Sequence, residues 1–468
     1  MHINKSFLLL FLLFLSATIF YSTSCAQSTQ LNWIGHWKGE DKRESLVDEV
    51  KKEFEFLNPD IRVNLVHDRD IVAKGDNFKW KTAYTIVEMI RTGNIKWDVV
   101  FLDIIVYNYV AELLKDPLWG VEHLVDFSTV PGFLQTQKEF IINDAFYRNQ
   151  TGGLLVGPYI EGYFFFFCQN KELARKAGVK IRERNMSVED LLTYARQLSE
   201  YNKKNNSSIP LIWLSAWNRL ESLFFNIFRS YFDDPEVAIE ESYSKEKEKA
   251  FFDTLLAFEK LSQYQPVINK DWQRVNWDEF KTGFLEGKGL LITGGSFMYN
   301  HFMAAEPEKF KSVGPAEYPV VKKSQGLVGN YTPVFAVMKN SPNKKVAIDL
   351  LMLWSEPKVA EKWVNYTRNP TGIKGHLDEP AFKAMPDEVF SRFVTELTEQ
   401  YRRLPMRYYQ QPVYVFGKNA PITPTAFRED LALILQGKQT ASNYFNDVMK
   451  RFNQEKKPDF SPYASEGE

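Results

Sequence analysis

Strand-like and helix-like patterns alternate along residues 31–114. Short apolar runs there predict strands, and apolar residues that recur at helical spacing predict helices. The strands are expected at 31–37, 61–66 and 96–103, and the helices at 45–57, 78–92 and 106–114. This alternation is typical of an α/β fold, in which helices cover both faces of a largely parallel sheet.

The stretch Gly152–Lys171 combines two apolar runs with a predicted bend between them. Gly157 has no side chain to restrict its backbone and Pro158 fixes its own φ, so the chain turns there without continuing a hydrogen-bonded ladder. The second run, Tyr163–Cys168, predicts a buried strand. Two interpretations stay open, namely a strand that crosses between two lobes and a single core strand with a bulge.

Strands and helices continue after this stretch, and end signals mark two of the helices. Gly178 is expected to end a short helix over 171–177, and Ser187 to cap the start of the next helix. Residues 314–321 are expected to bend around two prolines, and residues 455–468 to form a disordered polar tail. Further strands are expected at 209–214, 289–293 and 334–338, and further helices at 221–232, 245–264, 277–286, 343–355, 358–365 and over much of the chain from 388.

Residues 1–24 predict a secretory signal peptide rather than part of the fold. Lys5 gives a weakly positive start, and the mostly apolar run Phe7–Phe20 is too short for a spanning helix of about 20 residues. Ser24-Cys25 resembles a bacterial lipobox, which would attach lipid to Cys25, whereas a cut after Ala26 is the alternative. We therefore expect an exported protein, in the periplasm or at the cell surface, whose only membrane attachment is a lipid anchor.

Charge and motif content argue against several classes of function. The net charge is −1, so no basic field indicates nucleic-acid binding or attraction to anionic lipid. The six His residues show no metal-binding spacing, and the chain has no GxSxG, GxxxxGKS/T or GxGxxG motif. We expect no metal, no cofactor and no enzymatic activity. A glycosidase stays an alternative, because it needs only two well-placed carboxylates.

Five segments follow one another in an order and spacing typical of one family. They are Leu31–Lys38, Trp97–Asp103, Pro158–Lys171 with Gly178, Phe284–Thr293 and Asn340–Pro342. Through them the chain resembles the family 1 extracellular solute-binding proteins of bacterial ABC importers, the group that includes maltose-binding protein. The resemblance covers nearly all of the mature chain.

This resemblance implies a type II periplasmic binding protein fold, with two α/β lobes joined by crossing hinge segments and a ligand cleft between them. It implies a first lobe of residues 31–156 and 315–342, and a second lobe of residues 157–314 and 343–454. Ligands in such sheets bind beyond the carboxyl ends of strands. The candidate ligand-binding residues therefore follow strands, and they are Trp37, Lys38, Asp103, Tyr159, Glu161, Trp217, Asn218, Ser296, Phe297, Asn330 and Tyr331.

Several candidates also have a structural interpretation. Trp37 fits packing in the hydrophobic core as well as stacking on the apolar face of a sugar. Asp103 fits the capping position of the following helix, and Glu161 fits an exposed position on a strand. The Gly-x-Trp of the family is here Gly294-Gly295-Ser296-Phe297, so its usual stacking Trp is replaced. The identity of the ligand is more open than the fold.

The resemblance and the residue chemistry predict a monomeric protein that captures a carbohydrate, either a sugar or an oligosaccharide, by hinge closure and delivers it to the permease of an ABC importer. Flat aromatic rings can cover the apolar face of a sugar while carboxylates, Lys and Asn bind its hydroxyls. A polar group left unpaired in a closed cleft costs about 1–3 kcal/mol, which rejects wrong sugars. A sensory module for a membrane kinase and a secreted carbohydrate-active enzyme are the two alternatives.

Overall fold

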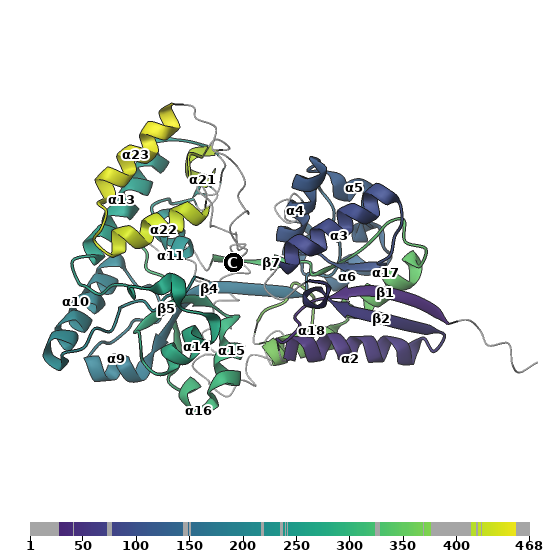
Figure 1. The fold of residues 1–468 in the computed structure, drawn as a ribbon, viewed down its shortest axis with the longest axis horizontal. Helices are drawn as coiled ribbons and strands as arrows, with labels where there is room; N and C mark the ends of the chain where they lie inside the picture. The colour runs from purple at the N-terminus through teal and green to yellow at the C-terminus, as the bar shows by residue number, and fades with distance from the viewer. Residues whose placement is uncertain are drawn as a thin grey trace, which may run out of the picture.

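Two lobes lie side by side in the computed structural model (Figure 1). The predicted signal peptide, Cys25, Trp217, Asn218 and the tail 455–468 fall outside the part of the chain that the structure describes. None of the described helices is both long and apolar enough to cross a membrane. The described residues are 28–40, 42–72, 77–143, 148, 151–216, 220–234, 237–238, 240, 242–322, 328–367, 369–375, 413–417, 420–422 and 424–454.

The first lobe is built on a four-stranded sheet in the order β2-β1-β3-β8. Strand β1 (Thr29–Gly35) pairs in parallel with β2 (Ile61–His67) and with β3 (Val99–Phe101). Strand β8 (Phe335–Val337) returns from late in the sequence and lies antiparallel to β3. The predicted parallel sheet is therefore confirmed, with one antiparallel edge strand added.

Helices lie on both faces of this sheet, with α2 (Lys42–Leu57) on one face and α3 (Phe78–Thr92) and α4 (Ile104–Leu114) on the other (Figure 1). Asn77 caps the start of α3 by accepting hydrogen bonds from two backbone N–H groups, and Gly93 ends the helix with a φ of 68°. The helical spacing of apolar residues thus predicted these three helices correctly. Shorter helical turns complete the lobe at η1 (Asp68–Ile71), α5 (Trp119–His123), η2 (Phe127–Thr129), α6 (Phe133–Thr136) and α7 (Glu139–Asn143).

The second lobe is organised around β4 (Glu161–Asn170), whose neighbours all run antiparallel to it. Strand β5 (Leu291–Gly295) pairs along one edge. Along the other edge, β6 (Val313–Ala316) pairs with the end of β4 and β7 (Val328–Thr332) pairs with its beginning. The predicted buried strand after the Gly157-Pro158 bend is confirmed, whereas the apolar run before the bend, 154–156, is not a strand.

Helices surround this second sheet, and their local signals match the sequence. Ser187 and Asp190 form a reciprocal capping box at the start of α10 (Val188–Asn205), and Gly178 ends α9 (Lys171–Ala177) with a φ of 68°. The expected strand 209–214 contributes only two isolated bridges, both at Ile212. The other helical elements are α11 (Leu220–Arg229), α13 (Lys245–Leu261), η3 (Trp272–Arg274), α14 (Trp277–Leu285), α15 (Met298–Ala305), α16 (Pro307–Phe310), α21 (Val413–Phe416), α22 (Pro424–Leu435) and α23 (Ala441–Asn453).

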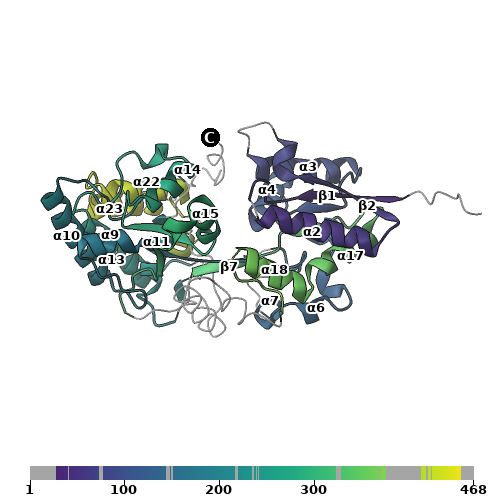
Figure 2. The ribbon, with the colours of Figure 1, turned by 90° about the horizontal axis from the view of Figure 1, so that it is seen from below.

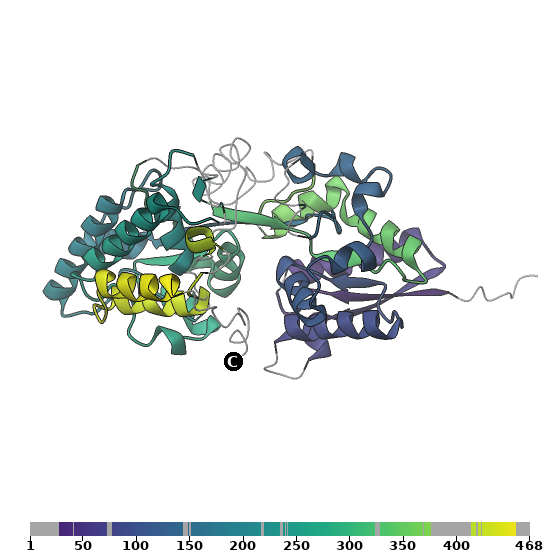
Figure 3. The same cartoon turned by 90° about the horizontal axis from the view of Figure 1, so that it is seen from above.

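Three segments run between the lobes and are bonded to one another. Glu161 at the start of β4 pairs in register with Thr332 at the end of β7, and Figure 2 and Figure 3 show β7 reaching across the space between the lobes. Gly162 N donates to Pro370 O at 3.0 Å, and Gly372 N donates to Tyr159 O at 2.8 Å. The bend at Gly157-Pro158 therefore belongs to a crossing between lobes, which decides between the two interpretations of that stretch.

The expected division of the chain between the lobes needs two corrections. Helices α17 (Lys344–Trp354) and α18 (Pro357–Thr367), which we expected in the second lobe, pack against α2 in the first lobe. Lys362 Nζ lies 2.8 Å from Glu49 of α2, because the two helices run next to each other. Strand β6, which overlaps the expected first-lobe segment 315–342, instead belongs to the sheet of the second lobe.

Candidate ligand-binding site

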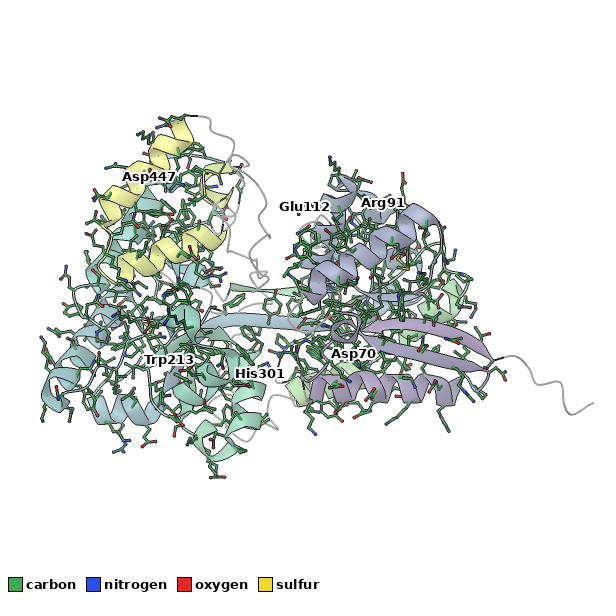
Figure 4. All side chains as sticks on the ribbon, in the orientation of Figure 1. Asp70, Arg91, Glu112, Trp213, His301 and Asp447 are labelled. Carbon is green, nitrogen blue, oxygen red and sulfur yellow. The ribbon has the colours of Figure 1, made fainter. Side chains whose placement is uncertain are left out.

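A cavity of about 220 Å³ lies between the two lobes. Its first wall comes from the β1–α2 loop and the start of α2, with Gly39, Glu40 and Arg43. Its second wall comes from α14 and α15 of the other lobe, with Lys281, His301, Ala304 and Ala305. Figure 4 shows His301 on the side of the second lobe that faces the first. Because residues of both lobes line it, this cavity is the part of the molecule that would change when the lobes move.

The β1–α2 loop is held in a shape that brings Glu40 and Arg43 to the cavity. Trp37 and Gly39 both have a left-handed backbone, with φ of 68° and 74°, so the chain reverses sharply after β1. Gly39 N donates to Glu44 Oε2 at 2.7 Å, which ties the loop to the first turn of α2. Arg69 also clamps the loop, since its Nη1 donates to Lys38 O at 3.1 Å.

Arg43 connects two carboxylates beside the cavity. Its Nη1 lies 3.1 Å from Glu40 Oε2 and 3.4 Å from Glu161 Oε1. Arg69 Nη2 adds a second cation at 2.9 Å from Glu40 Oε1. The guanidinium of Arg43 also lies over the ring of Trp363, 5.5 Å from its centroid. The two carboxylates come from different segments, the β1–α2 loop and the crossing strand β4, so Arg43 joins the lobe wall to the hinge.

Burial and neighbouring charges shift the pKa values of the two carboxyls in opposite directions. Burial raises the pKa of Glu40, but the charges of Arg43, His36 and Arg69 outweigh it, and that pKa lies below its usual range. Burial also raises the pKa of Glu161, and here Arg43 and His36 compensate only in part. The fold therefore holds Glu40 as a stable carboxylate and Glu161 as a carboxyl whose charge is disfavoured.

His301 is held as a neutral ring on the opposite wall. Burial lowers its pKa from 6.5 to about 4, and the charge of Arg43 adds to this effect. Its ring meets that of Trp277 edge to face, with centroids 5.2 Å apart. A neutral imidazole carries one donor and one acceptor nitrogen, which suits it to a hydroxyl group.

Aromatic side chains stand next to these polar groups. Lys281 Nζ lies 5.8 Å from the ring centroid of Trp277, and Phe297 at the start of α15 packs edge to face against Tyr163, 6.5 Å between centroids. Glu161 and Tyr163 are two positions apart on β4 and so point to the same face of the strand. Phe297 and His301 are four positions apart and share a face of α15. The arrangement offers carboxylates, cations and a half-buried indole to one ligand.

Four of the sequence-predicted residues lie around this site, although none of the four lines the cavity itself. Lys38 is exposed and pairs with Glu44 at 3.2 Å. Asp103 caps α4 by accepting from Val106 N at 2.8 Å, and Lys79 Nζ lies 2.7 Å from its other oxygen. Glu161 and Phe297 take the positions described above. Asp103 therefore has the capping role that we considered as its alternative, while its charge also raises the pKa of Glu161.

Four other predicted residues are fully buried and do not line the cavity. Trp37 packs in an aromatic cluster with Trp363, 5.1 Å between centroids, because its left-handed backbone follows a reversal of the chain. Tyr159 lies in the core at the crossing, and Ser296 Oγ accepts from Phe164 N at 3.1 Å. Tyr331 packs over Gly162 in the hinge. These four residues therefore lie in the core and the hinge rather than at the cavity.

The remaining predictions are only partly located. Asn330 pairs with Tyr163 across β7 and β4. The part of the chain that the structure describes includes neither the side chain of Asn330 nor any part of Trp217 and Asn218. Among the described residues, no group of three His, Cys, Asp or Glu side chains is placed to hold a metal ion.

Sequence reasoning missed most of the charged cavity wall. Glu40 follows β1 closely, so the same rule that selected Lys38 could have selected it. Arg43, Lys281 and His301 lie on helices without a motif, and only the packing of the two lobes brings them together. No signal in one sequence identifies such residues.

A second cavity, of about 610 Å³, lies within the second lobe beside Trp213, the residue labelled in that lobe in Figure 4. Its lining residues all come from segments 208–213, 265–270, 288 and 436–438 of that lobe. A ligand there would touch one lobe only and could not hold the two lobes together. The smaller cavity between the lobes is therefore the better candidate site.

The sequence profile of the bacterial extracellular solute-binding protein family matches residues 78–389. The chain belongs to this family. Members of such a family bind solutes outside the cytoplasm, which agrees with a cavity formed between two lobes. No curated protein sequence matches the chain significantly.

Solved structures with the same architecture show that the fold is that of two-lobed binding proteins. The GacH receptor of Streptomyces glaucescens, studied with acarbose, is 16% identical with a TM-score of 0.61, over 91% of this chain and 99% of that chain. Maltose-bound MalE3 of T. maritima is 14% identical with a TM-score of 0.64, over 91% and 99%. Lmo0181 of Listeria monocytogenes, in complex with cycloalternan, is 14% identical with a TM-score of 0.61, over 91% and 98%. At these identities the likeness establishes the type II fold.

Proposed function

We propose that this protein captures a carbohydrate between its lobes and delivers it to the permease of an ABC importer. The observation that carries the proposal is the cavity lined by Glu40 and Arg43 from one lobe and by Lys281 and His301 from the other. A ligand that contacts both walls favours the closed arrangement by the contacts it makes only there.

Two lines of support point to a carbohydrate rather than another solute. Similar solved structures hold acarbose, raffinose, maltose and cycloalternan. The site also combines charged hydrogen-bonding groups with aromatic rings, and a sugar presents hydroxyls at its edge and C–H groups on its face. A small inorganic ion would leave the aromatic part of the site unused.

Each side chain has a role in this proposal. The carboxylates of Glu40 and Glu161 accept hydrogen bonds from sugar hydroxyls. Lys281 donates hydrogen bonds to the oxygens of such hydroxyls. His301 serves as a neutral donor or acceptor, and the half-buried indole of Trp277 gives a flat apolar surface. Arg43 neutralises the two carboxylates and keeps them in place. Charged partners make the stronger hydrogen bonds, about 1.5–3 kcal/mol each.

The remaining parts of the proposal concern the setting of the protein. We propose that it works outside the cytoplasm as a monomer, held to the membrane through lipid on Cys25, and that the sugar leaves unchanged. The family supports an extracellular location, and the lipobox-like Ser24-Cys25 supports the anchor.

Calorimetry with a panel of maltose, raffinose, acarbose and cycloalternan tests the proposal. We expect at least one to bind, and we expect Lys281→Ala to weaken binding by about tenfold or more, because a charged hydrogen bond contributes about 1.5–3 kcal/mol. Lys438→Ala, at the other cavity, is the matched control and should bind as the unchanged protein does. Chromatography should recover the sugar intact.

Binding that Lys281→Ala leaves unchanged and Lys438→Ala removes would move the site to the second lobe. Failure of the whole panel to bind would count against the carbohydrate class. Appearance of hydrolysed sugar would favour the enzyme alternative instead.

A further inference from the structure

The two most exposed large apolar side chains of the described residues are neighbours in the sequence. Phe56 is 83% exposed and Leu57 is 57% exposed, at the last two positions of α2. Single exposed apolar residues are common and need no explanation. Two adjacent ones, one of them a nearly bare aromatic ring, form a small apolar tip on the surface of the first lobe.

This tip lies at the end of the lobe where the chain enters the fold. Thr29, the first residue of β1, donates its N–H to Asp60 O at 2.9 Å, in the tight turn that follows α2. Figure 1 and Figure 2 show the end of α2 beside the starts of β1 and β2, at the end of the lobe away from the second lobe. The apolar tip and the N-terminal entry point are therefore at the same place.

The chain length between Cys25 and this place is short. Four residue steps separate Cys25 from Thr29, and a fully extended chain covers at most about 3.6 Å per residue, so the two can be no more than about 14 Å apart. A lipid on Cys25 would hold the end of the first lobe within that distance of the bilayer surface. Side chains at that end would therefore lie within reach of the headgroup region.

The surroundings of the tip suit an anionic lipid surface. Lys52 is exposed and lies four positions before Phe56, so the two share a face of α2. Arg62 is also exposed, and its guanidinium folds over the turn to donate to Pro59 O and Ile61 O. Asp60 is an exposed carboxylate that opposes them, while the partly exposed Glu53 and Glu55 are paired with Lys358 and Lys51. Apolar residues flanked by cations are the composition by which soluble segments settle at a membrane interface.

We propose that Phe56 and Leu57 form a membrane-contact tip, which inserts into the headgroup region of an anionic bilayer when Cys25 is lipidated. The proposal rests on the proposed lipid anchor and is independent of the ligand. The tip and the anchor together would fix which end of the first lobe faces the membrane, whereas the anchor alone would leave the lobe free to rotate.

The test places a fluorescent label on the tip of the full lipidated chain. In a Phe56→Cys variant the new thiol is the reactive one, because lipid occupies the Cys25 sulfur and Cys168 is fully buried. The thiol carries acrylodan, and the protein is reconstituted into vesicles of phosphatidylcholine with phosphatidylglycerol. The control is Leu433→Cys, labelled in the same way on α22 of the second lobe, at a residue that is 38% exposed.

We expect the label at position 56 to shift its emission to shorter wavelength on vesicles, and to be quenched by iodide several-fold less than the label at position 433. Equal quenching at both positions would overturn the proposal while leaving the anchor intact. A shift that requires an added membrane protein would assign the tip to a protein partner and would likewise overturn it. Intact mass measures lipidation of Cys25 separately; without that modification the proposal falls, and carbohydrate binding is untouched.

Discussion

The Glu161 carboxyl sits at the start of the crossing strand, where its charge is disfavoured. Burial raises its pKa, and the charges of Glu40 and Asp103 add to the effect, while Arg43 opposes it. A carboxyl with a raised folded pKa contributes stability that is fully present below its unfolded pKa and is lost as the pH rises through the folded pKa. At neutral pH the ionised Glu161 therefore lowers the stability of the folded state. Ionisable groups in ligand sites often have pKa values shifted in this way.

Glu161→Gln should make the unliganded protein more stable at pH 7 and weaken ligand binding. This gain in stability should shrink below pH 4.5, the usual pKa of a Glu side chain. The Glu side chain is then mostly uncharged, like Gln, in both the folded and the unfolded protein. Urea unfolding at pH 7 and pH 4 measures this. Glu122→Gln is the control, since that side chain is 78% exposed. A less stable Glu161→Gln protein at pH 7 would contradict the account.

His301 gives a second pH dependence of stability with the opposite sign, although burial is again the main cause of the pKa shift. Its folded pKa of about 4 lies below the usual 6.5, so the unfolded chain takes up a proton between these values while the folded protein does not. The share of stability that His301 contributes is thus present above pH 6.5 and is lost as the pH falls towards 4.

The unchanged protein should therefore lose more thermal stability than His301→Gln between pH 7 and pH 4.5. Titration of the His301 ring by NMR gives an independent reading, with a midpoint near 4 expected. A midpoint near 6.5 would show that the ring is open to water and that the wall of the cavity is arranged differently.

Single residues also show the limit of sequence-based site prediction. Lys38 lies beside the cavity as the rule for residues after strands expects, because it closely follows β1, whereas Glu161 begins β4 and reaches the site through its contact with Arg43. Trp37 follows the same rule but lies in the core, because its φ of 68° accompanies a chain reversal and its indole packs against Trp363. Backbone handedness and contacts from late in the sequence decided this outcome, and neither is visible locally.

At the scale of elements, the crossing of β4 and β7 is the feature that joins the lobes. Gly162 lies there in very close packing: a Cβ at this position would come 2.5 Å from the Tyr331 ring and 2.8 Å from Pro370 O. Both contacts come from the other crossing segments, so a side chain at residue 162 would force the hinge apart.

Gly162→Ala should destabilise the protein by about 1–3 kcal/mol, the usual range for overpacking. Urea unfolding measures the change. Combining it with Tyr331→Leu should recover part of the loss, because the ring is removed while Pro370 O stays. If Gly162→Ala unfolds like the unchanged protein, the crossing segments have room to move apart and the hinge is looser than the structure indicates.

Helices and strands in which apolar residues recur at regular spacing were predictable, and elements without such spacing were not. The helices 78–92 and 171–177 were predicted with their observed bounds, because Asn, Gly and the apolar spacing mark them locally. Strand β6 contains Pro315, which the sequence indicated only as a bend, and β4 supplies the partner that makes it a strand. The placement of α17 and α18 beside α2 depends on long-range packing, for which their own amphipathic pattern carries no information.

At the scale of the whole molecule, the order of segments predicted the two-lobed fold, and the family and the solved structures confirm it. The lobe that each segment joins was harder to predict, since the chain crosses between lobes at the bonded segments near Tyr159, Tyr331 and Pro370. The ligand was hardest, because the charged walls meet only when both lobes are assembled.

The account depends on a ligand that bridges the two lobes. It would contact Glu40 and Arg43 of the first lobe and Lys281 and His301 of the second. Small-angle X-ray scattering, with and without the saccharide that calorimetry identifies, tests this most directly. We predict that the radius of gyration falls at saturation in the unchanged protein and falls less in Lys281→Ala. A scattering profile that stays the same while the saccharide is fully bound would contradict the account, since the ligand would then occupy one lobe without drawing the other toward it.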